Sequence, residues 1–196
     1  MKLVFATHNK NKVEEVRAIF PAHFSLLSLT EIGCTEDIPE TGKTLMENAS
    51  LKANYVTQKF GYPCFADDTG LLVNALKGAP GVYSARYAGE HRNANDNMDK
   101  LLNELADKKE RTARFETVIA LNLNNEQYIF TGKIEGEIIH NKSGEKGFGY
   151  DPVFKPNGYD KTFAELPLEI KNKIGHRGKA IQKLISYLKS LAHVTE

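Results

Sequence analysis

The sequence has no tryptophan and only two cysteines, Cys34 and Cys64. Two cysteines cannot build a disulfide framework, and neither lies in a C-x-x-C motif or a Cys/His cluster, so we expect both to be small apolar side chains. The apolar opening at residues 3–6 is far shorter than the roughly 20 apolar residues of a membrane span, and it is also too short for a signal-peptide core. We therefore expect a cytoplasmic protein without a membrane partner.

Neither positive nor negative charge dominates, since the chain has 26 Lys and Arg and 25 Asp and Glu. A nucleic-acid-binding domain needs a basic excess, so we expect no nucleic acid partner, and any anion must be bound by a local cluster. The length of 196 residues and the hydrophobic content of 41% suit one domain over residues 1–196, or at most two lobes that share a core.

Hydrophobic periodicity predicts alternating strands and helices in the first half and a β-hairpin around Asn124 and Asn125 in the second. This order favours an α/β fold with a mixed sheet. The run at residues 63–66 is expected to end where Asp67 begins. The predicted strands are residues 1–6, 26–29, 63–66, 113–123 and 127–139, and the predicted helices are residues 11–20, 44–60, 93–106 and 179–191.

The first strand and helix are joined by a polar loop that carries Thr7, Asn9, Lys10 and Lys12. In open α/β sheets, ligands gather at the carboxyl ends of strands, where helix N-termini attract anions. A hydroxyl, an amide and two cations there suit phosphate oxygens. Alternatively, Thr7 or Asn9 caps the helix and the lysines are solvated.

Two adjacent acids, Asp67 and Asp68, follow a buried apolar run. Neighbouring like charges near an apolar interior repel each other, and a divalent cation such as Mg²⁺, which prefers carboxylate oxygens and phosphates, would neutralise them. The alternative is a turn in which one aspartate caps the backbone and the other is exposed.

Two further acids, Glu40 and Glu47, are candidates for the same metal. Thr44 and Glu47 also fit the spacing of a capping box, so a helix-capping role for Glu47 competes with metal binding. Glu40 lies in the preceding loop, where a solvated side chain is the alternative.

Late in the chain, Lys171, His176 and Arg177 form a basic group, with Gly178 between them and the last predicted helix. Their donors suit a phosphate or the carbonyl edge of a base, although a lone histidine is commonly structural. Phe148 and Tyr150, in a glycine-rich loop, offer flat surfaces for stacking a base or for anchoring the loop.

Taken together, short motifs in a fixed order cover nearly the whole chain. They are FATHNKNK at 5–12, ETG at 40–42, ENA at 47–49, ADDTGL at 66–71, GAPGVYSARY at 78–87, GFGYDP at 147–152 and HRG at 176–178. This order resembles the inosine triphosphate pyrophosphatase family, also called XTP/dITP diphosphatases or non-canonical purine NTP pyrophosphatases.

The resemblance implies a mixed, twisted β-sheet flanked by helices, with two lobes and the active-site cleft between them. The implied reaction cleaves ITP, dITP or XTP between the α and β phosphates, giving a nucleoside monophosphate and pyrophosphate and cleansing the nucleotide pool. Magnesium is the implied cofactor. The resemblance also suggests a homodimer, with residues 78–87 as a contact region.

The resemblance further implies a role for each matching residue. The triphosphate would be held by Thr7, His8, Asn9, Lys10, Asn11 and Lys12. Asp68 would bind magnesium and activate the water, supported by Glu47, Glu40 and Asp67. The substrate would be contacted by Thr69, the purine by Phe148, Gly149, Tyr150 and Asp151, and the base and phosphates by Lys171, His176 and Arg177.

Two positions depart from the family pattern: Gly175 replaces a common serine, and His8 replaces a frequent glycine. Two functions compete with the implied one. The first is a metal-dependent phosphatase that removes the terminal phosphate, or a house-cleaning enzyme for modified pyrimidines. The second is a nucleotide-binding module without catalysis.

Overall fold

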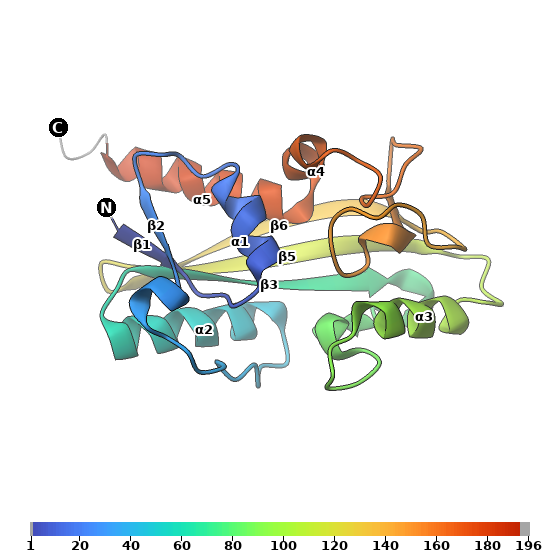
Figure 1. Cartoon of the computed structure of the whole chain (residues 1–196), viewed down its shortest axis with the longest axis horizontal. Helices are drawn as coiled ribbons and strands as arrows, with labels where there is room; N and C mark the ends of the chain where they lie inside the picture. Colours follow the sequence, from blue (N-terminus) through green and yellow to red (C-terminus); the bar gives the residue numbers. More distant parts are fainter. Residues whose placement is uncertain (1, 193–196) are drawn as a thin grey trace. The chain divides into compact units, whose positions relative to one another are not determined.

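The computed structural model describes residues 2–192. The strands are β1 (Lys2–Phe5), β2 (Ser25–Ser28), β3 (Cys64–Val73), β4 (Pro80–Gly81), β5 (Thr112–Leu123), β6 (Glu126–Ile138) and β7 (Phe154–Pro156) (Figure 1). The α-helices are α1 (Lys10–Arg17), α2 (Leu45–Phe60), α3 (Ala94–Glu104), α4 (Leu168–Ile174) and α5 (His176–Ala192). Single 3-10 turns occur at Thr30–Ile32, Asn74–Leu76, Ser84–Arg86 and Asp151–Val153. None of the helices within residues 2–192 combines the length and the apolar character that crossing a membrane requires.

The strands form one seven-stranded sheet in the order β2-β1-β3-β5-β6-β7, with β4 paired to β3. β1 is parallel to β2 and β3, whereas β4 and β7 are antiparallel to their partners. β5 and β6 are neighbours joined by Asn124 and Asn125, whose φ angles of 53° and 65° are those of a hairpin turn. The predicted α/β fold with a mixed sheet is confirmed.

The chain divides into two compact units. Unit 1 contains residues up to 68, residues 117–132 and residues from 177 onward, whereas unit 2 contains residues 69–116 and 133–176. β3, β5 and β6 each contribute residues to both units. Each unit has its own hydrophobic core.

In unit 1 the strands are apolar on both faces, and helices cover each face. Leu3, Phe5 and Phe65 pack with the apolar stripe of α5, whereas the intervening Val4 and Ala66 pack with α2. Figure 1 shows α2 and α5 on opposite sides of β1 and β3. Because side chains alternate along a strand, the two sets of residues are the two sides of the same pleat. The rings of Phe5 and Phe65 stack with centroids 4.6 Å apart.

In unit 2, α3 contributes the predicted inward residues Met98 and Leu101 to a core that is rich in phenylalanine. Phe115 of β5 meets Phe154 edge to face at 4.7 Å. The odd positions of β5 from 113 to 123 are all buried, as the sequence pattern predicts.

Two local expectations were wrong, and two short elements were missed. β3 does not end at Asp67 but continues to Val73, because cations from distant segments compensate the buried carboxylates. His176 and Arg177 are not separated from the last helix, since they form the first turn of α5 and Gly178 lies inside it. The short elements α4 and β7 were not predicted, because seven and three residues are too few to establish a periodicity.

Candidate functional site

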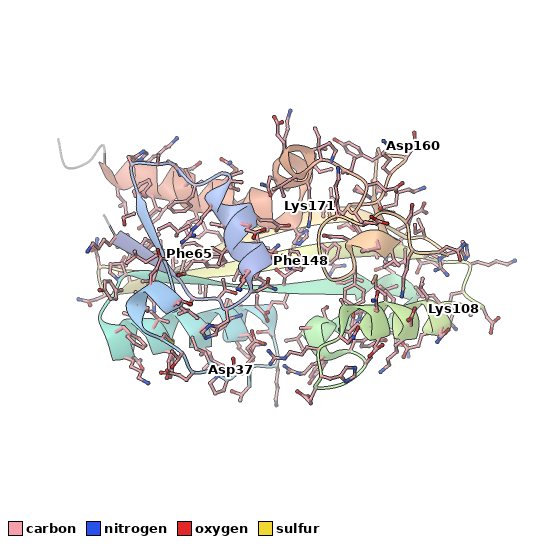
Figure 2. All side chains as sticks on the ribbon, viewed as in Figure 1. Asp37, Phe65, Lys108, Phe148, Asp160 and Lys171 are labelled. Carbon is pink, nitrogen blue, oxygen red and sulfur yellow. The ribbon has the colours of Figure 1, made fainter. Side chains whose placement is uncertain are left out.

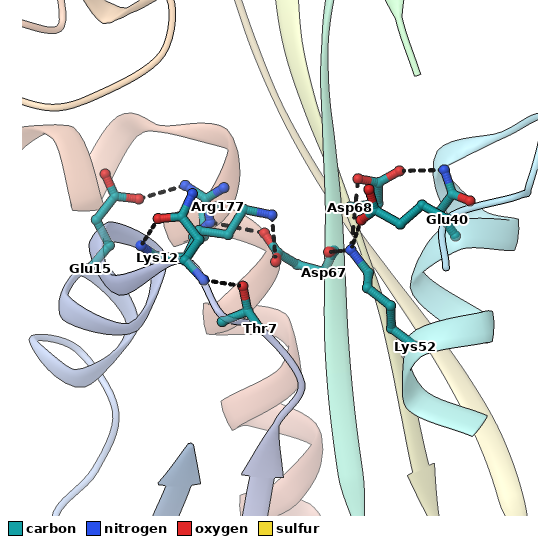
Figure 3. A network of polar contacts seen from close by, with 10 residues as sticks. Thr7, Lys12, Glu15, Glu40, Lys52, Asp67, Asp68 and Arg177 are labelled. Carbon is teal, nitrogen blue, oxygen red and sulfur yellow. Dashed lines mark hydrogen bonds and ion pairs between the residues drawn. The ribbon is translucent and has the colours of Figure 1, made fainter. Parts of the chain in front are cut away.

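Asp67 and Asp68 lie on opposite faces of β3. Figure 3 shows Asp67 turned toward Lys12 and Arg177, and Asp68 turned toward Lys52 and Glu40. Both are buried, with exposures of 0% and 8%. Because successive side chains of a strand point to opposite faces, two adjacent acids are kept apart, and each has its own set of partners.

Asp67 is the centre of a buried network of ion pairs. Lys12 Nζ lies 2.9 Å from its Oδ1, and Arg177 Nε lies 3.0 Å from its Oδ2. The guanidinium of Arg177 also contacts Glu15, with Nη1 2.5 Å from Oε2. These residues come from α1, β3 and the first turn of α5, so Asp67 holds Lys12 and Arg177 in place.

The electrostatics of this network favour the charged forms of its acid and its arginine. Burial by itself raises the pKa of Asp67, but Lys12 and Arg177 outweigh it and hold that pKa well below its ordinary value. Burial opposes the charge on Arg177, yet Asp67 and Glu15 raise its pKa. For Lys12, burial dominates and lowers the pKa, although Asp67 acts in the opposite direction.

The loop before α1 begins at the end of β1 and leads into the helix N-terminus. Asn9 is the N-cap, and its Oδ1 accepts a hydrogen bond from the Lys12 amide at 3.3 Å. Thr7 Oγ1 accepts from the Asn9 amide at 3.1 Å. The capping alternative for Asn9 is therefore confirmed, and it leaves the carboxamide NH₂ of the same side chain as a donor.

The other residues of this loop have different surroundings. His8 is exposed, and its Nε2 lies 3.0 Å from the backbone oxygen of Glu36. Lys10 and Asn11 are exposed in the first turn of α1. The dipole of that helix adds to the positive potential of Lys10 and Lys12, so the N-terminus of α1 can bind an anion.

On its other face, β3 presents Asp68 to α2. Lys52 Nζ donates to Glu40 Oε1 at 2.6 Å and to the Asp67 backbone oxygen at 2.7 Å, and it lies 3.9 Å from Asp68 Oδ1. Asn48 Nδ2 donates to Asp68 Oδ2 at 3.1 Å. Two carboxylates thus surround a single ammonium group.

Burial raises the pKa of Asp68 above its ordinary value, against the opposing influence of Lys52 and Lys12. The pKa values of the two neighbouring aspartates are therefore displaced in opposite directions. Such divergence between paired acids is typical of sites where one acid accepts a proton and the other stays charged.

Glu47 is exposed in the first turn of α2, and its Oε2 accepts from the Lys43 amide at 2.6 Å. Thr44 Oγ1 accepts from the Glu47 amide at 3.1 Å, so the N-terminus of the helix is capped much as the sequence pattern indicated. Metal binding by Glu47 stays a prediction.

Within residues 2–192, no three His, Cys, Asp or Glu side chains converge to hold a metal ion by themselves. Asp68 and Glu40 share Lys52 as a neighbour. Two carboxylates suffice for Mg²⁺ when phosphates and water supply the remaining ligands.

Unit 2 contains a second polar cluster, around Asp151. Lys171 Nζ lies 2.5 Å from Asp151 Oδ2, and the Phe148 amide donates to the same oxygen at 2.8 Å. The ammonium lies 4.9 Å from the centroid of the Phe148 ring (Figure 2). Gly147 has φ of 75°, and a Cβ there would lie 2.1 Å from Asp151 Oδ2, so the close approach of this loop requires glycine.

The remaining predicted residues of unit 2 are placed differently. Tyr150 is in the core, 4% exposed, and donates to the Ser84 backbone oxygen at 2.9 Å, which fits the anchoring alternative. His176 is buried, and its ring stacks on Phe115 at 4.6 Å. Thr69 is half-buried in β3, and Gly149 has φ of 64°.

Gly175 joins α4 to α5, and its amide donates to the Lys171 backbone oxygen at 2.8 Å. A Cβ at this position would lie 2.5 Å from that same oxygen. This backbone therefore has no room for the serine that the family pattern commonly carries here.

Sequence reasoning missed Glu15, Asn48 and Lys52. A usable signal was present, because Glu15 follows Lys12 by three positions and Lys52 follows Asn48 by four, so each pair shares a helix face. Asn48 and Lys52 also adjoin the buried Ala49 and Ala53, and polar residues beside such a stripe indicate buried partners.

Replacing Asp67 by asparagine is expected to lower the free energy of unfolding by about 3–5 kcal/mol, because Lys12 and Arg177 would stay buried without their carboxylate. Urea denaturation measures this change. Glu31→Gln is the matched control, since the Arg17–Glu31 pair is half-exposed and its loss should cost less than about 1 kcal/mol. Equal losses in the two variants would contradict the assignment.

Comparisons with known proteins agree over nearly the whole chain. Residues 3–187 match the Ham1 family. A dITP/XTP pyrophosphatase of Flavobacterium johnsoniae is 64% identical over 96% of this chain and 98% of its own length. A protein of the same name from Bacillus subtilis is 46% identical over 95% of this chain and 96% of its own length.

Solved structures show the same fold. The Staphylococcus aureus Ham1 protein has a TM-score of 0.88 and 41% identity, covering 97% of this chain and 99% of that one. A HAM1 protein from Coxiella burnetii also has a TM-score of 0.88, with 38% identity and the same coverage. The resemblance identified from the sequence motifs is thus confirmed, and the chain belongs to the Ham1 family.

Proposed function

We propose that this protein hydrolyses dITP, XTP and ITP to the nucleoside monophosphate and pyrophosphate, and so removes non-canonical purine nucleotides from the pool. The observation that carries the proposal is the division of labour along β3. Asp67 fixes the cations Lys12 and Arg177 on one face, while Asp68, on the other face, lies beside Lys52 and Asn48. The relatives named dITP/XTP pyrophosphatase, which match this chain over nearly its whole length, support the same activity.

The charged cluster around Asp67 and Asp68 in unit 1 suits a metal-bound polyphosphate. When all groups are ionised, three cations face four carboxylates, a net charge of −1. The cations are Lys12, Lys52 and Arg177, and the carboxylates are Glu15, Glu40, Asp67 and Asp68. This cluster has no net positive charge to offer a polyanion, and a divalent cation would supply it.

Asp68 and Glu40 are the residues that would hold Mg²⁺. Their oxygens are of the type that this ion prefers, and one or two carboxylates are its usual protein ligands beside substrate phosphates. Asp67 would support the site indirectly, through its ion pair with Lys12. Glu47 lies in the first turn of α2, one position before Asn48, which contacts Asp68. When bound, the metal would supply charge neutralisation on the phosphate oxygens.

The side chains of the protein would carry out the remaining steps. Asn9, Lys12 and the N-terminus of α1 would bind and orient the triphosphate. Asp68 would take the proton of the attacking water. The new bond joins the water oxygen to phosphorus as the link between the α and β phosphates breaks. Lys12 would balance the charge of the departing pyrophosphate.

The cluster of unit 2 suits a purine with a carbonyl at position six. The ring of Phe148 offers a stacking surface, and Lys171 offers N–H donors that are held by Asp151. Hypoxanthine and xanthine would accept these hydrogen bonds, whereas the amino group of adenine would oppose them. Each mismatch costs about 1–3 kcal/mol.

The proposal includes a homodimer in the cytoplasm, where the nucleotide pool lies. Tyr83, in the segment 78–87 named above, is a large side chain that is 55% exposed. An exposed aromatic is typical of interfaces. Light scattering on the purified protein should give twice the mass of the 21.9 kDa chain. Replacing Tyr83 by glutamate should shift the mass toward the monomer, and an unchanged mass would exclude this contact.

With magnesium present, dITP, ITP and XTP should yield pyrophosphate, and ATP should react roughly 100- to 10,000-fold more slowly in kcat/KM, because two donor mismatches oppose it. A panel of nucleoside triphosphates, scored separately for pyrophosphate and orthophosphate, measures this. Orthophosphate as the product would favour a phosphatase, and faster turnover of modified pyrimidines would favour another house-cleaning activity. Equal rates for ATP and ITP would remove the selectivity claim.

Asp68→Asn should reduce kcat by about 100- to 10,000-fold, because the amide can neither take the proton nor offer a charged ligand. Removing divalent ions with a chelator should have a similar effect on the wild type, and added magnesium should restore it. Nucleotide binding by the variant can be measured by calorimetry. Retained turnover in Asp68→Asn would show that this residue has no catalytic role, whereas a wild-type protein that binds dITP without releasing pyrophosphate would be a binding module.

A further inference from the structure

Asn48 is a buried polar residue to which the proposed mechanism assigns no role. Its side chain is 1% exposed at the start of α2, one turn before Lys52. The carboxamide has two partners, since Nδ2 donates to Asp68 Oδ2 at 3.1 Å and Oδ1 accepts from the Gly42 amide at 2.8 Å. It therefore bridges β3 and the segment that contains Glu40.

The orientation of this amide is fixed by chemistry. The Gly42 backbone N–H is a donor, so the carbonyl oxygen of Asn48 must face it and the NH₂ group must face Asp68. Gly42 also has no room for a side chain, because a Cβ there would lie 2.7 Å from Asn48 Oδ1 and 2.6 Å from Glu47 Cβ. The segment and the asparagine are in close contact.

The two oxygens of Asp68 consequently have different surroundings. Oδ2 accepts from the amide of Asn48, whereas Oδ1 lies 3.9 Å from Lys52 Nζ, which is itself bonded to Glu40. An amide donor on one oxygen fixes the rotation of the carboxylate, and so determines which oxygen faces Glu40 and Lys52.

We propose that Asn48 is a positioning residue that holds Asp68 by Oδ2, directs Oδ1 toward Lys52 and Glu40, and ties the Glu40 segment to the same carboxylate through Gly42. This inference rests on the proposed function, because it assumes that Asp68 takes part in the reaction. Asn48 acts through Asp68 and is not expected to touch the triphosphate. Its loss should therefore affect turnover more than substrate binding.

Asn48→Asp is the sharpest test, since it keeps the size of the side chain and the acceptor for Gly42 but places a carboxylate against Asp68. We expect kcat for dITP to fall about 10- to 100-fold, the cost of a misplaced catalytic group, with KM changed by less than about threefold. Asn54→Asp is the matched control on the same helix. Asn54 Oδ1 accepts from Asn122 and Gln127, and an aspartate keeps both bonds, so its kinetics should match the wild type.

A second variant guards against misfolding. Asn48→Ser removes the bridge without adding a charge, and it should show the same loss of kcat at unchanged KM. Circular dichroism and thermal melting report the folded fraction of each variant.

Several results would overturn the inference. These are wild-type kcat in a folded Asn48→Asp or Asn48→Ser protein, and a loss carried by KM alone. The wild type in the same assay distinguishes a failure of the proposed function from a failure of the role of Asn48. If it releases no pyrophosphate from dITP, the proposed function fails and the inference fails with it. If it does, unchanged kcat in the variants overturns the role of Asn48 alone.

Discussion

The alternation of side chains along β3 is the constraint on which the site depends. It sends Asp67 to the face covered by α1 and α5, and Asp68 to the face covered by α2. One acid meets Lys12 and Arg177, while the other meets Lys52 and Asn48. A shift of register by one residue would exchange these partners, so the hydrophobic pattern that fixes the strand also fixes the chemistry.

Buried charges in this protein are compensated by residues far away in the sequence. Arg177 reaches Asp67 across 110 positions and Glu15 across 162. Such pairs add little net stability compared with apolar packing, but breaking one leaves a charge without its partner in the interior. The ionic network thus fixes the positions of Lys12 and Arg177, and the apolar layers of unit 1 supply the stability.

Much of the fold could be predicted from the sequence because it is encoded locally. The odd positions of β5, the apolar stripe of α2 and the Asn124-Asn125 turn each carry a periodic or conformational signal within a few residues. The course of β3 through Asp67 and Asp68 could not be predicted, since its local pattern is that of a turn and its compensation comes from other elements. Glu15, Asn48 and Lys52 could be suspected from their spacing on a helix face, but their partners Arg177 and Asp68 lie far away in the sequence. Motif order indicated the family and supplied the candidate residues, and the fold shows how the candidates in unit 1 divide between two faces.

The contact between the Gly175 backbone and the Lys171 carbonyl limits how this chain can diverge from its present form. A single exchange to serine would place its Cβ 2.5 Å from a peptide oxygen, so the backbone around Gly175 would have to shift to accept a side chain. Such an exchange would therefore alter the link between α4 and α5, and not the side chain at one position alone.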